Sequence, residues 1–517
     1  MRSEGSKPSF TIFAMIAATL FSKALGLCRS MLLAWTLGDL PEAVAFAAAS
    51  KIPGAFFDIF FSAAILGAFM PHYSAAKEES EASAAGFAGA FFGAALAASS
   101  LLALLGVIFA PAVISFSAPK ISGENALLAA RLLRIMFPSA VFTAGVYTLT
   151  GVLQARGSFI LPAFVSALSN IFIIAYFVLF RARFSLFALA AVFTFSWAVQ
   201  FLVLALPLAA KKRFPRPKLA PSDPHLRAAL KNAPKITAGS WFAPASVLAA
   251  AFFCSFVSES AFVLYDYAFG IYAIVSGVAV YGVGNYVFPK LSRLYASKNA
   301  SLFSSELKKA LFTIILMTIP VFCGAEVLAG DAVSLLYARG NFSAEAAKAC
   351  TLALRTLAFA MPAFSVSEIL YRAFCAAGRV KTAALAALVS AAALGSANAL
   401  SLYLGGGLFG VCASFAVSQW VHALFLLFSA KPFFADEKSG KYAQKTALAA
   451  LGGTLCFAAM LISRQKLDFF PKLAPSFSNL LKITIVFGMG IVIYLLYVYI
   501  MGFFCPEKKK KKRGETA

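Results

Sequence analysis

The chain has 517 residues, of which 61% are hydrophobic and only 13% are charged, whereas soluble domains carry about 25% charged residues. A soluble fold of this composition would lack the polar side chains needed to cover its surface, which excludes a soluble enzyme and indicates an integral membrane protein. The formal net charge of +24 raises nucleic acid as a partner. The basic residues, however, lie in short loops between apolar segments and in a C-terminal run, as in membrane proteins, so we expect no nucleic-acid binding.

Apolar segments follow one another along almost the whole chain, and most are about twenty residues or longer. Such lengths favour helices that satisfy their own backbone in lipid, not the ten-residue alternation of a β-barrel. We therefore predict an all-α integral membrane protein with about 14 transmembrane helices. In chain order the predicted spans are 10–36, 43–70, 85–115, 127–154, 159–180, 185–209, 236–257, 262–288, 308–338, 347–375, 381–404, 408–429, 444–463 and 480–504.

Two sets of six spans are similar in sequence, and this predicts a duplicated architecture. The sequence around Pro71, at the end of the second span, is similar to that around Pro289, at the end of the eighth. Parallel repeats of this kind recur in transporters whose two lobes move about a central site, although chance similarity between amphipathic helix ends is the alternative. The predicted division is an N-lobe over 1–209, a basic loop over 210–235, a C-lobe over 236–430, a helix pair over 431–505 and a basic tail over 506–517.

The distribution of Lys and Arg predicts the orientation of the chain. An even number of spans places both termini on one side, and the segments on that side carry about 29 Lys and Arg, against about 8 on the other. The densest loop contains Lys211, Lys212 and Arg213. The positive-inside rule therefore predicts that both termini are cytoplasmic. The first segment is long and contains Lys23, so we expect a retained helix and not a cleaved signal peptide.

Several ordered motifs resemble those of the MurJ (MviN) lipid II flippases. The first motif runs from Ser22 to Arg29 (Ser-Lys-Ala-Leu-Gly-Leu-Cys-Arg), and Gly38, Lys51-Ile-Pro53 and Ala68-Phe-Met-Pro71 follow it. Further matches are Arg134-Ile-Met-Phe-Pro138, Gly151-Val-Leu-Gln, Phe159-Ile-Leu-Pro-Ala-Phe164, Ser169-Asn170, and the segment from Ser276 to Ser292. The likeness covers nearly the whole chain, including the plan of six, six and two helices, and the final pair favours this family over twelve-span relatives.

The resemblance implies a fold of the MOP flippase and exporter superfamily, with two lobes around a cationic cavity. It also implies a transporter in the bacterial cytoplasmic (inner) membrane, with no enzyme activity and no cofactor. Its cargo would be lipid II, the undecaprenyl-pyrophosphoryl disaccharide-pentapeptide, moved from the inner to the outer leaflet by alternating access and driven by the membrane potential or a Na⁺ or H⁺ gradient. The final helix pair would form a groove for the undecaprenyl tail. The alternatives are a MATE-like or O-antigen-flippase-like exporter of another lipid-linked saccharide or amphipathic solute, and a membrane scaffold that transports nothing.

The cations in the first two spans are the candidate substrate-binding residues. A charge in mid-membrane costs several kcal/mol on insertion scales, so it usually faces a cavity or a partner, and Arg and Lys bind phosphate oxygens well. The predicted set is Ser22, Lys23, Arg29 and Lys51, the last because it matches a family lysine. Alternatively, Lys23 and Arg29 pair with acids such as Asp58 or extend to the membrane surface, and Lys51 marks a helix kink.

A second set of polar residues lies in the predicted C-lobe. Glu368 and Arg372 are four residues apart, which favours an internal ion pair over a ligand site. Asp266 is a candidate for ion coupling, and Asn398 is a weaker one that more simply makes an interhelical hydrogen bond. The eight cysteines form no CxxC pair and the three histidines are far apart, so we expect no disulfide and no metal site.

Four positions depart from the pattern of the family. An essential basic residue after the proline of the second helix aligns with Phe57, and a basic residue of the eighth helix aligns with Gly270. Acidic residues of the family align with Val44 and Ser62 in the same way. If the missing cations bind pyrophosphate, this chain binds lipid II more weakly, binds another cargo, or has a rearranged polar network.

Overall fold

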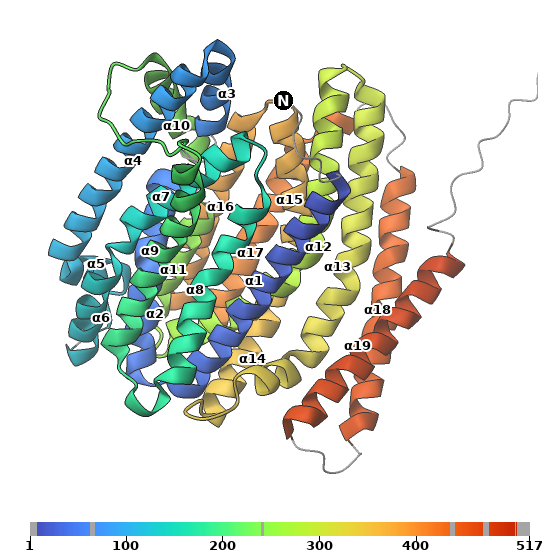
Figure 1. The fold of residues 1–517 in the computed structure, drawn as a ribbon. Coiled ribbons are helices and arrows are strands. Elements are labelled where there is room, and N and C mark those ends of the chain that lie inside the picture. Colours follow the sequence, from blue (N-terminus) through green and yellow to red (C-terminus); the bar gives the residue numbers. More distant parts are fainter. Residues whose placement is uncertain are drawn as a thin grey trace, which may run out of the picture.

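The computed structural model describes residues 8–62, 68–121, 123–238, 242–434, 440–468, 475–501 and 503. Within these residues every regular element is a helix, and together the helices form one bundle (Figure 1). The predicted all-α fold is therefore confirmed. The helices of the first half are α1 (Pro8–Thr36), α2 (Pro41–Phe57), α3 (Phe69–Glu79), α4 (Glu81–Ile108), α5 (Ala110–Ser117), α6 (Gly123–Met136), α7 (Ser139–Ala155), α8 (Ile160–Leu179) and α9 (Leu186–Ala210).

The second half of the chain continues in the same way. Its helices are α10 (Pro224–Ala238), α11 (Phe242–Ser255), α12 (Ala261–Ala296), α13 (Ala300–Leu336), α14 (Ala344–Ala358), α15 (Met361–Ala376), α16 (Val380–Tyr403), α17 (Gly407–Ser429), α18 (Gly440–Asp468) and α19 (Pro475–Ile500). A π-helical turn, Asp58–Ser62, extends α2, and short 3₁₀ helices lie at Arg181–Arg183 and Lys431–Phe434.

Nine helices in the described part of the chain are long and apolar enough to cross a membrane, or up to eleven if each of two bent pairs is one span. Bent and short helices account for part of the lower count. The fourth and tenth predicted spans are the two bent pairs, and the apolar helix in the seventh, Pro244–Ser255, is too short to be counted. The third predicted span breaks at Phe109 into α4 and α5, but α4 alone is long enough to cross. The predicted number of about 14 stays a prediction, because length and composition alone do not settle whether each broken helix crosses the bilayer.

The two halves share an unusual bend, which supports the predicted repeat. Helices α6 and α7 meet at an angle of 40°, and α14 and α15 meet at 43°. Both breaks lie beside a proline, Pro138 in the first half and Pro362 in the second, and proline disrupts the backbone hydrogen bonds of a helix. The fourth and tenth predicted spans are thus bent at corresponding places, and the prediction of two lobes in pseudo-repeat is confirmed.

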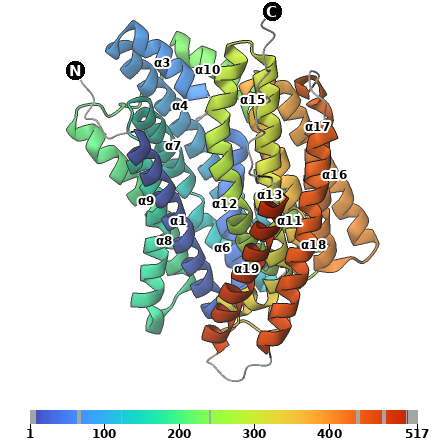
Figure 2. The ribbon, with the colours of Figure 1, turned by 90° about the vertical axis from the view of Figure 1, so that its right-hand side faces the viewer.

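Helices α18 and α19 stand at the edge of the bundle (Figures 1 and 2). They pack against α13, and side chains from all three helices form a separate apolar cluster that includes Leu316, Cys456 and Val486. The hydroxyl of Tyr497 also donates a hydrogen bond to the carbonyl oxygen of Leu448 at 2.8 Å, which joins α19 to α18. This pair therefore stands outside the two lobes, as predicted. A tail-binding groove along it stays a prediction.

The predicted basic loop packs against the helical bundle. Its first part lies against α4, where the backbone N–H of Lys218 donates to the carbonyl oxygen of Gly89 at 3.0 Å. A side chain at Gly93 would collide with the backbone of Lys218, since its Cβ would lie 2.2 Å from the carbonyl oxygen. The remainder of the loop begins α10, which contacts α3 and α4 of the N-lobe and α16 of the C-lobe. The loop thus connects the lobes through packing as well as through the chain.

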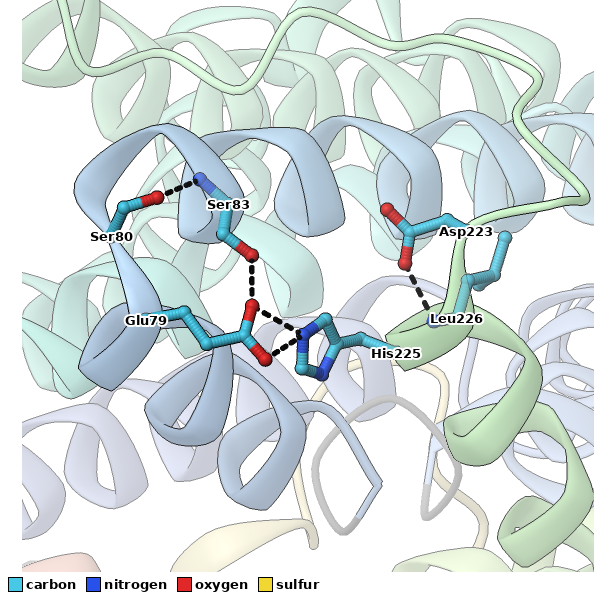
Figure 3. A network of polar contacts seen from close by, with 6 residues as sticks. All are labelled: Glu79, Ser80, Ser83, Asp223, His225 and Leu226. Carbon is cyan, nitrogen blue, oxygen red and sulfur yellow. Dashed lines mark hydrogen bonds and ion pairs between the residues drawn. The ribbon is translucent and has the colours of Figure 1, made fainter.

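A small polar network holds α10 against the N-lobe (Figure 3). Nε2 of His225 lies 3.1 Å from the carboxylate of Glu79, and the Ser83 hydroxyl donates to the same carboxylate at 2.8 Å. These two hydrogen bonds hold the pKa of Glu79 below its ordinary value, the bond from Ser83 being the larger cause. The network lies at the turn between α3 and α4, outside the apolar part of the bundle.

Candidate functional site

A cavity of about 410 Å³ lies between the two lobes. Helices α1, α2, α8 and α9 of the N-lobe supply one wall, and α12 of the C-lobe supplies the other. The lining residues are Lys23, Gly26, Arg29, Ser30, Leu33, Leu37, Ala43, Phe46, Ala47, Ser50, Lys51, Ile173, Phe193, Val263, Asp266, Tyr267, Gly270 and Ile274. Four residues selected from the sequence therefore meet in this cavity: Lys23, Arg29, Lys51 and Asp266. Asp266 comes from α12, which follows α2 by some two hundred positions.

An ion pair crosses this cavity from lobe to lobe. Nζ of Lys51 on α2 lies 2.8 Å from Oδ1 of Asp266 on α12, with the two side chains 39% and 29% exposed. Both groups are thus partly exposed to water, which screens their charges and weakens the attraction between them. Because its two members belong to different lobes, this contact must break whenever the lobes separate here.

Arg29 is the most enclosed cation of the cavity. Its Nε atom is buried and has no hydrogen-bond partner among the described residues, while its charge interacts with that of Asp266. A buried guanidinium donor without a partner is costly. A buried, unpaired donor on a cation that lines the cavity therefore favours an anionic ligand.

The cavity as a whole carries an excess of positive charge. Its lining includes three cations, Lys23, Arg29 and Lys51, and one carboxylate, Asp266, which leaves two positive charges in excess. Apolar side chains make up most of the remaining wall, and a low-dielectric wall strengthens the attraction for an anion. The geometry can thus hold a polyanionic group such as a pyrophosphate.

The structure does not bring Ser22 into the cavity lining. Its hydroxyl accepts a hydrogen bond from Ser166 at 3.2 Å, and its carbonyl oxygen accepts one from Nδ2 of Asn170, also at 3.2 Å. Both partners lie on α8. Asn170 also lies close to Gly26, where the absent side chain gives it room. Ser22 therefore joins α1 to α8 in this conformation.

Three of the polar residues selected in the C-lobe, Glu368, Arg372 and Asn398, are not among the described residues that line the cavity. Nη2 of Arg372 lies 3.0 Å from Oε1 of Glu368, so the predicted internal ion pair is confirmed. Asn398 is buried in α16, where its Nδ2 donates to the carbonyl oxygen of Leu394 at 2.8 Å. The expected interhelical bond was wrong, because the amide turns back to its own helix. Of the candidates for ion coupling, the structure places only Asp266 among the described lining residues.

The two positions at which the basic residues of the family are missing have different surroundings. Phe57 is buried in the N-lobe, with its ring centroid 5.4 Å from that of Phe61 and 5.5 Å from that of Tyr147. Gly270, in contrast, lines the cavity, and a Cβ at this position would lie 3.8 Å from the hydroxyl of Tyr337. In this conformation only the second departure removes a side chain from the cavity wall.

Sequence reasoning missed a contact between the lobes at the end of the cavity where α1 ends and α2 begins. The carboxylate of Asp39, just before α2, accepts hydrogen bonds from the backbone N–H of Ser343 at 3.1 Å and from its hydroxyl at 2.9 Å. Nδ2 of Asn341 donates to the carbonyl oxygen of Thr36 at 2.7 Å, and Tyr267 donates to that of Gly38 at 3.3 Å. We call these six residues the latch. Gly38 was noticed only as part of a motif, because no local pattern reveals contacts between distant turns.

Backbones approach each other closely at the latch. Gly38 has a φ of +55°, and a Cβ there would lie 2.1 Å from the carbonyl oxygen of Asn341. Glycine is therefore required at this position for two reasons, its backbone conformation and the lack of space for a side chain.

Within the described part of the chain, no three His, Cys, Asp or Glu side chains converge on a possible metal ion, here or elsewhere.

The all-helical bundle, with two lobes in pseudo-repeat around a cationic cavity, defines a class of multi-pass membrane transporters. An inward-facing multidrug resistance MATE family transporter of the MOP superfamily has this fold. It superposes with a TM-score of 0.66 and 16% identity, over 82% of this chain and 98% of that one. A solved lipid II flippase MurJ, in an inward closed conformation, superposes with a TM-score of 0.80 and 22% identity, over 95% of this chain and 99% of that one.

Comparison of sequences gives the family. The family described as lipid II flippase MurJ matches residues 33–507. A probable lipid II flippase MurJ of Bdellovibrio bacteriovorus is 24% identical over 524 aligned positions, which cover 99% of this chain and 98% of that protein. The chain therefore belongs to the lipid II flippase MurJ family.

Proposed function

We propose that this protein moves lipid II from the inner to the outer leaflet of a bacterial cytoplasmic membrane. The observation that carries the proposal is the excess of positive charge in the cavity between the lobes, centred on Arg29 with its buried donor that lacks a described partner. A pyrophosphate bound there would meet cations in a region with little water, where charge-assisted hydrogen bonds are strong. Membership of the family supports the choice of cargo.

The residues have separate roles in this proposal. Arg29 and Lys23 contact the pyrophosphate, and Lys51 turns to it when the ion pair with Asp266 opens. The undecaprenyl tail stays in lipid beside α18 and α19. No covalent bond is made or broken during flipping, so the proposal requires no nucleophile and no cofactor. Ser22, which contacts α8, is not part of this set.

Alternating access follows from the arrangement of the latch. With the latch formed, the lobes are joined below the cavity, and cargo would leave on that side only after the Asp39–Ser343 and Lys51–Asp266 contacts have opened. Both termini are cytoplasmic in this proposal, so the latch lies at the outer face. Membrane potential or an ion gradient biases the exchange, since charged groups of the cavity shift within the field.

The test is complementation in bacteria depleted of their own lipid II flippase. We expect the parent chain to support growth, Arg29→Gln to abolish it and Lys23→Gln to weaken it. Lys381→Gln, which removes an exposed cation at the start of α16, is the matched control and should behave as the parent. Expression and membrane insertion are measured for each variant. An inserted, folded parent that fails to support growth would contradict lipid II as the cargo.

A second candidate is an exporter of another lipid-linked saccharide or amphipathic solute. It is favoured by Gly270, which leaves the cavity wall without the cation that the family carries in the eighth helix. Removing α18 and α19 by ending the chain after residue 434 separates the two proposals. Loss of transport in a truncated protein whose two lobes still fold supports a tail-binding role for the pair, and retained transport supports the exporter.

A further inference from the structure

A second cavity, of about 370 Å³, lies between the end of α13, one face of α14 and the end of α18. It shares no described lining residue with the cavity between the lobes, and the proposed transport does not use it. Its lining residues are Gly330, Asp331, Ser334, Ala347, Lys348, Thr351, Leu352, Arg355 and Arg464. The cavity thus lies where the peripheral helix pair meets the C-lobe.

The charges of this second cavity are unbalanced. Nε of Arg464 on α18 donates to Oδ2 of Asp331 on α13 at 2.6 Å, and the Asp331 side chain is only 8% exposed. This ion pair uses the one carboxylate of the described lining. Lys348 and Arg355 remain as two further cations on α14, so the cavity attracts an anion.

Arg355 is the clearest sign of a missing partner. Its Nε is buried and has no hydrogen-bond partner among the described residues, and the same holds for Oε1 of Glu326, one turn before Gly330. The two charges interact, yet no described ion pair joins them. Burying a charged donor without a hydrogen bond costs free energy of desolvation. A ligand that accepts a hydrogen bond from Arg355 would offset this cost.

The position of the cavity selects the kind of ligand. Asp331 and Arg464 lie about one turn before the ends of α13 and α18, and Lys348 lies about one turn after the start of α14. These three helix ends point to the face opposite the start of α1 (Figure 1). Arg355 lies about 10 Å farther along the axis of α14 than Lys348, at 1.5 Å per residue. The cavity thus runs from the membrane surface inward.

An apolar side chain stands beside these cations. Lys348, Thr351, Leu352 and Arg355 share one face of α14, because they are spaced by three and four residues. Leu352 is 50% exposed, and in a membrane protein an exposed leucine at this depth meets hydrocarbon. The occupant therefore has an anionic group at the surface and an apolar chain directly beside it.

We infer that this second cavity binds the phosphate group of an anionic membrane lipid. Arg355 and Lys348 bind the phosphate oxygens, the Asp331–Arg464 pair closes the far side, and the first part of an acyl chain lies on Leu352. The bound lipid joins α14 to α18 and so anchors the peripheral pair to the C-lobe. The inference does not depend on the transported cargo.

The test uses the full chain and phosphatidylglycerol, with phosphatidylcholine as the zwitterionic comparison. Native mass spectrometry of the detergent-solubilised protein, titrated with each lipid, measures the affinity for the first bound molecule. We expect phosphatidylglycerol to bind more tightly than phosphatidylcholine. Arg355→Gln and Lys348→Gln should each weaken the first phosphatidylglycerol by about tenfold, as loss of a charge-assisted hydrogen bond does. Lys381→Gln is again the matched control.

Three results would overturn the inference. The first is an unchanged phosphatidylglycerol affinity in both variants, and the second is an equal affinity of the parent for phosphatidylcholine. The third is inorganic phosphate binding the parent as tightly as the lipid, which would make this a site for free anions. If Arg355→Gln does not fold, Lys348→Gln decides, because this side chain is exposed and its loss leaves the packing intact.

Discussion

The two ends of the bundle are built differently. Toward the latch, both lobes contribute to one continuous apolar core, which contains Phe46 and Leu133 of the N-lobe with Tyr265 and Phe415 of the C-lobe. Toward the other end, where α1 begins (Figure 2), the described residues form separate cores, one in each lobe. A shared core resists separation because opening it exposes apolar surface.

This difference indicates that the structure represents the conformation in which the two lobes are closed at the latch end. The lobes are joined by packing and hydrogen bonds at the latch end, and at the other end α10 contacts helices of both lobes. Opening the latch therefore requires a rearrangement of the shared core, whereas each separate core can move as a unit. The four predictions below test that comparison, from the largest expected effect to the smallest.

The largest effect is expected for Gly38→Ala. Alanine at a φ of +55° is strained, and its Cβ would collide with the carbonyl oxygen of Asn341. We expect the closed latch to lose about 2–4 kcal/mol. Amide hydrogen exchange measured by mass spectrometry should rise in residues 35–43 and 338–346. Gly378→Ala is the matched control, since its φ is +68° but nothing lies within 4 Å of its Cβ. Equal exchange in the two variants would contradict a latch role for Gly38.

A smaller effect is expected for Asp39→Ala. The change removes two hydrogen bonds to Ser343, while the Ser343 hydroxyl still caps α14 by accepting from Ala346. We expect a loss of about 1 kcal/mol at the latch, seen as faster exchange in the same two segments. The separate cores at the other end should keep their protection. Uniformly faster exchange would instead indicate general destabilisation, and the latch would not be a distinct unit.

The ion pair in the cavity should contribute less to stability than to function. A double-mutant cycle with Lys51→Met and Asp266→Asn measures the coupling of the two side chains, which we expect to be about 0.5–1 kcal/mol, because both are partly exposed. The measurement is the free energy of unfolding in detergent. A coupling near zero would show that water replaces this contact at no cost, and that the ion pair does not help to hold the lobes together.

The smallest effect is expected at the other end of the bundle, for Glu79→Gln. The pKa of Glu79 is lowered by the bonds from Ser83 and His225, so the folded state binds its proton less readily than the unfolded state does. The stabilisation is present above the ordinary pKa of 4.5 and is lost as the pH falls through the lowered value. The melting temperature of the parent should therefore fall more steeply below pH 4.5 than that of Glu79→Gln. Glu78→Gln, at an exposed neighbour, should match the parent.

Sequence alone determined the class of this protein and much of its plan. Composition and apolar length do not depend on neighbours, so the membrane fold and the peripheral helix pair could be predicted from the chain. The same reasoning identified Lys23, Arg29 and Lys51 as unusual, because a charge in an apolar segment is costly wherever the helix lies. Local spacing also predicted the Glu368–Arg372 pair, whose members share one face of a helix.

Only the tertiary structure decided which of these residues meet. Asp266 reaches Lys51 because α12 packs beside α1 and α2, and Phe57 leaves the cavity wall because its ring packs with Phe61 and Tyr147. The latch and the second cavity depend on contacts between segments far apart in the chain, and hydrophobic periodicity carries no information about such pairs. The side chains of a helix can be read from its sequence, but what lies opposite them is determined by the packing of whole helices.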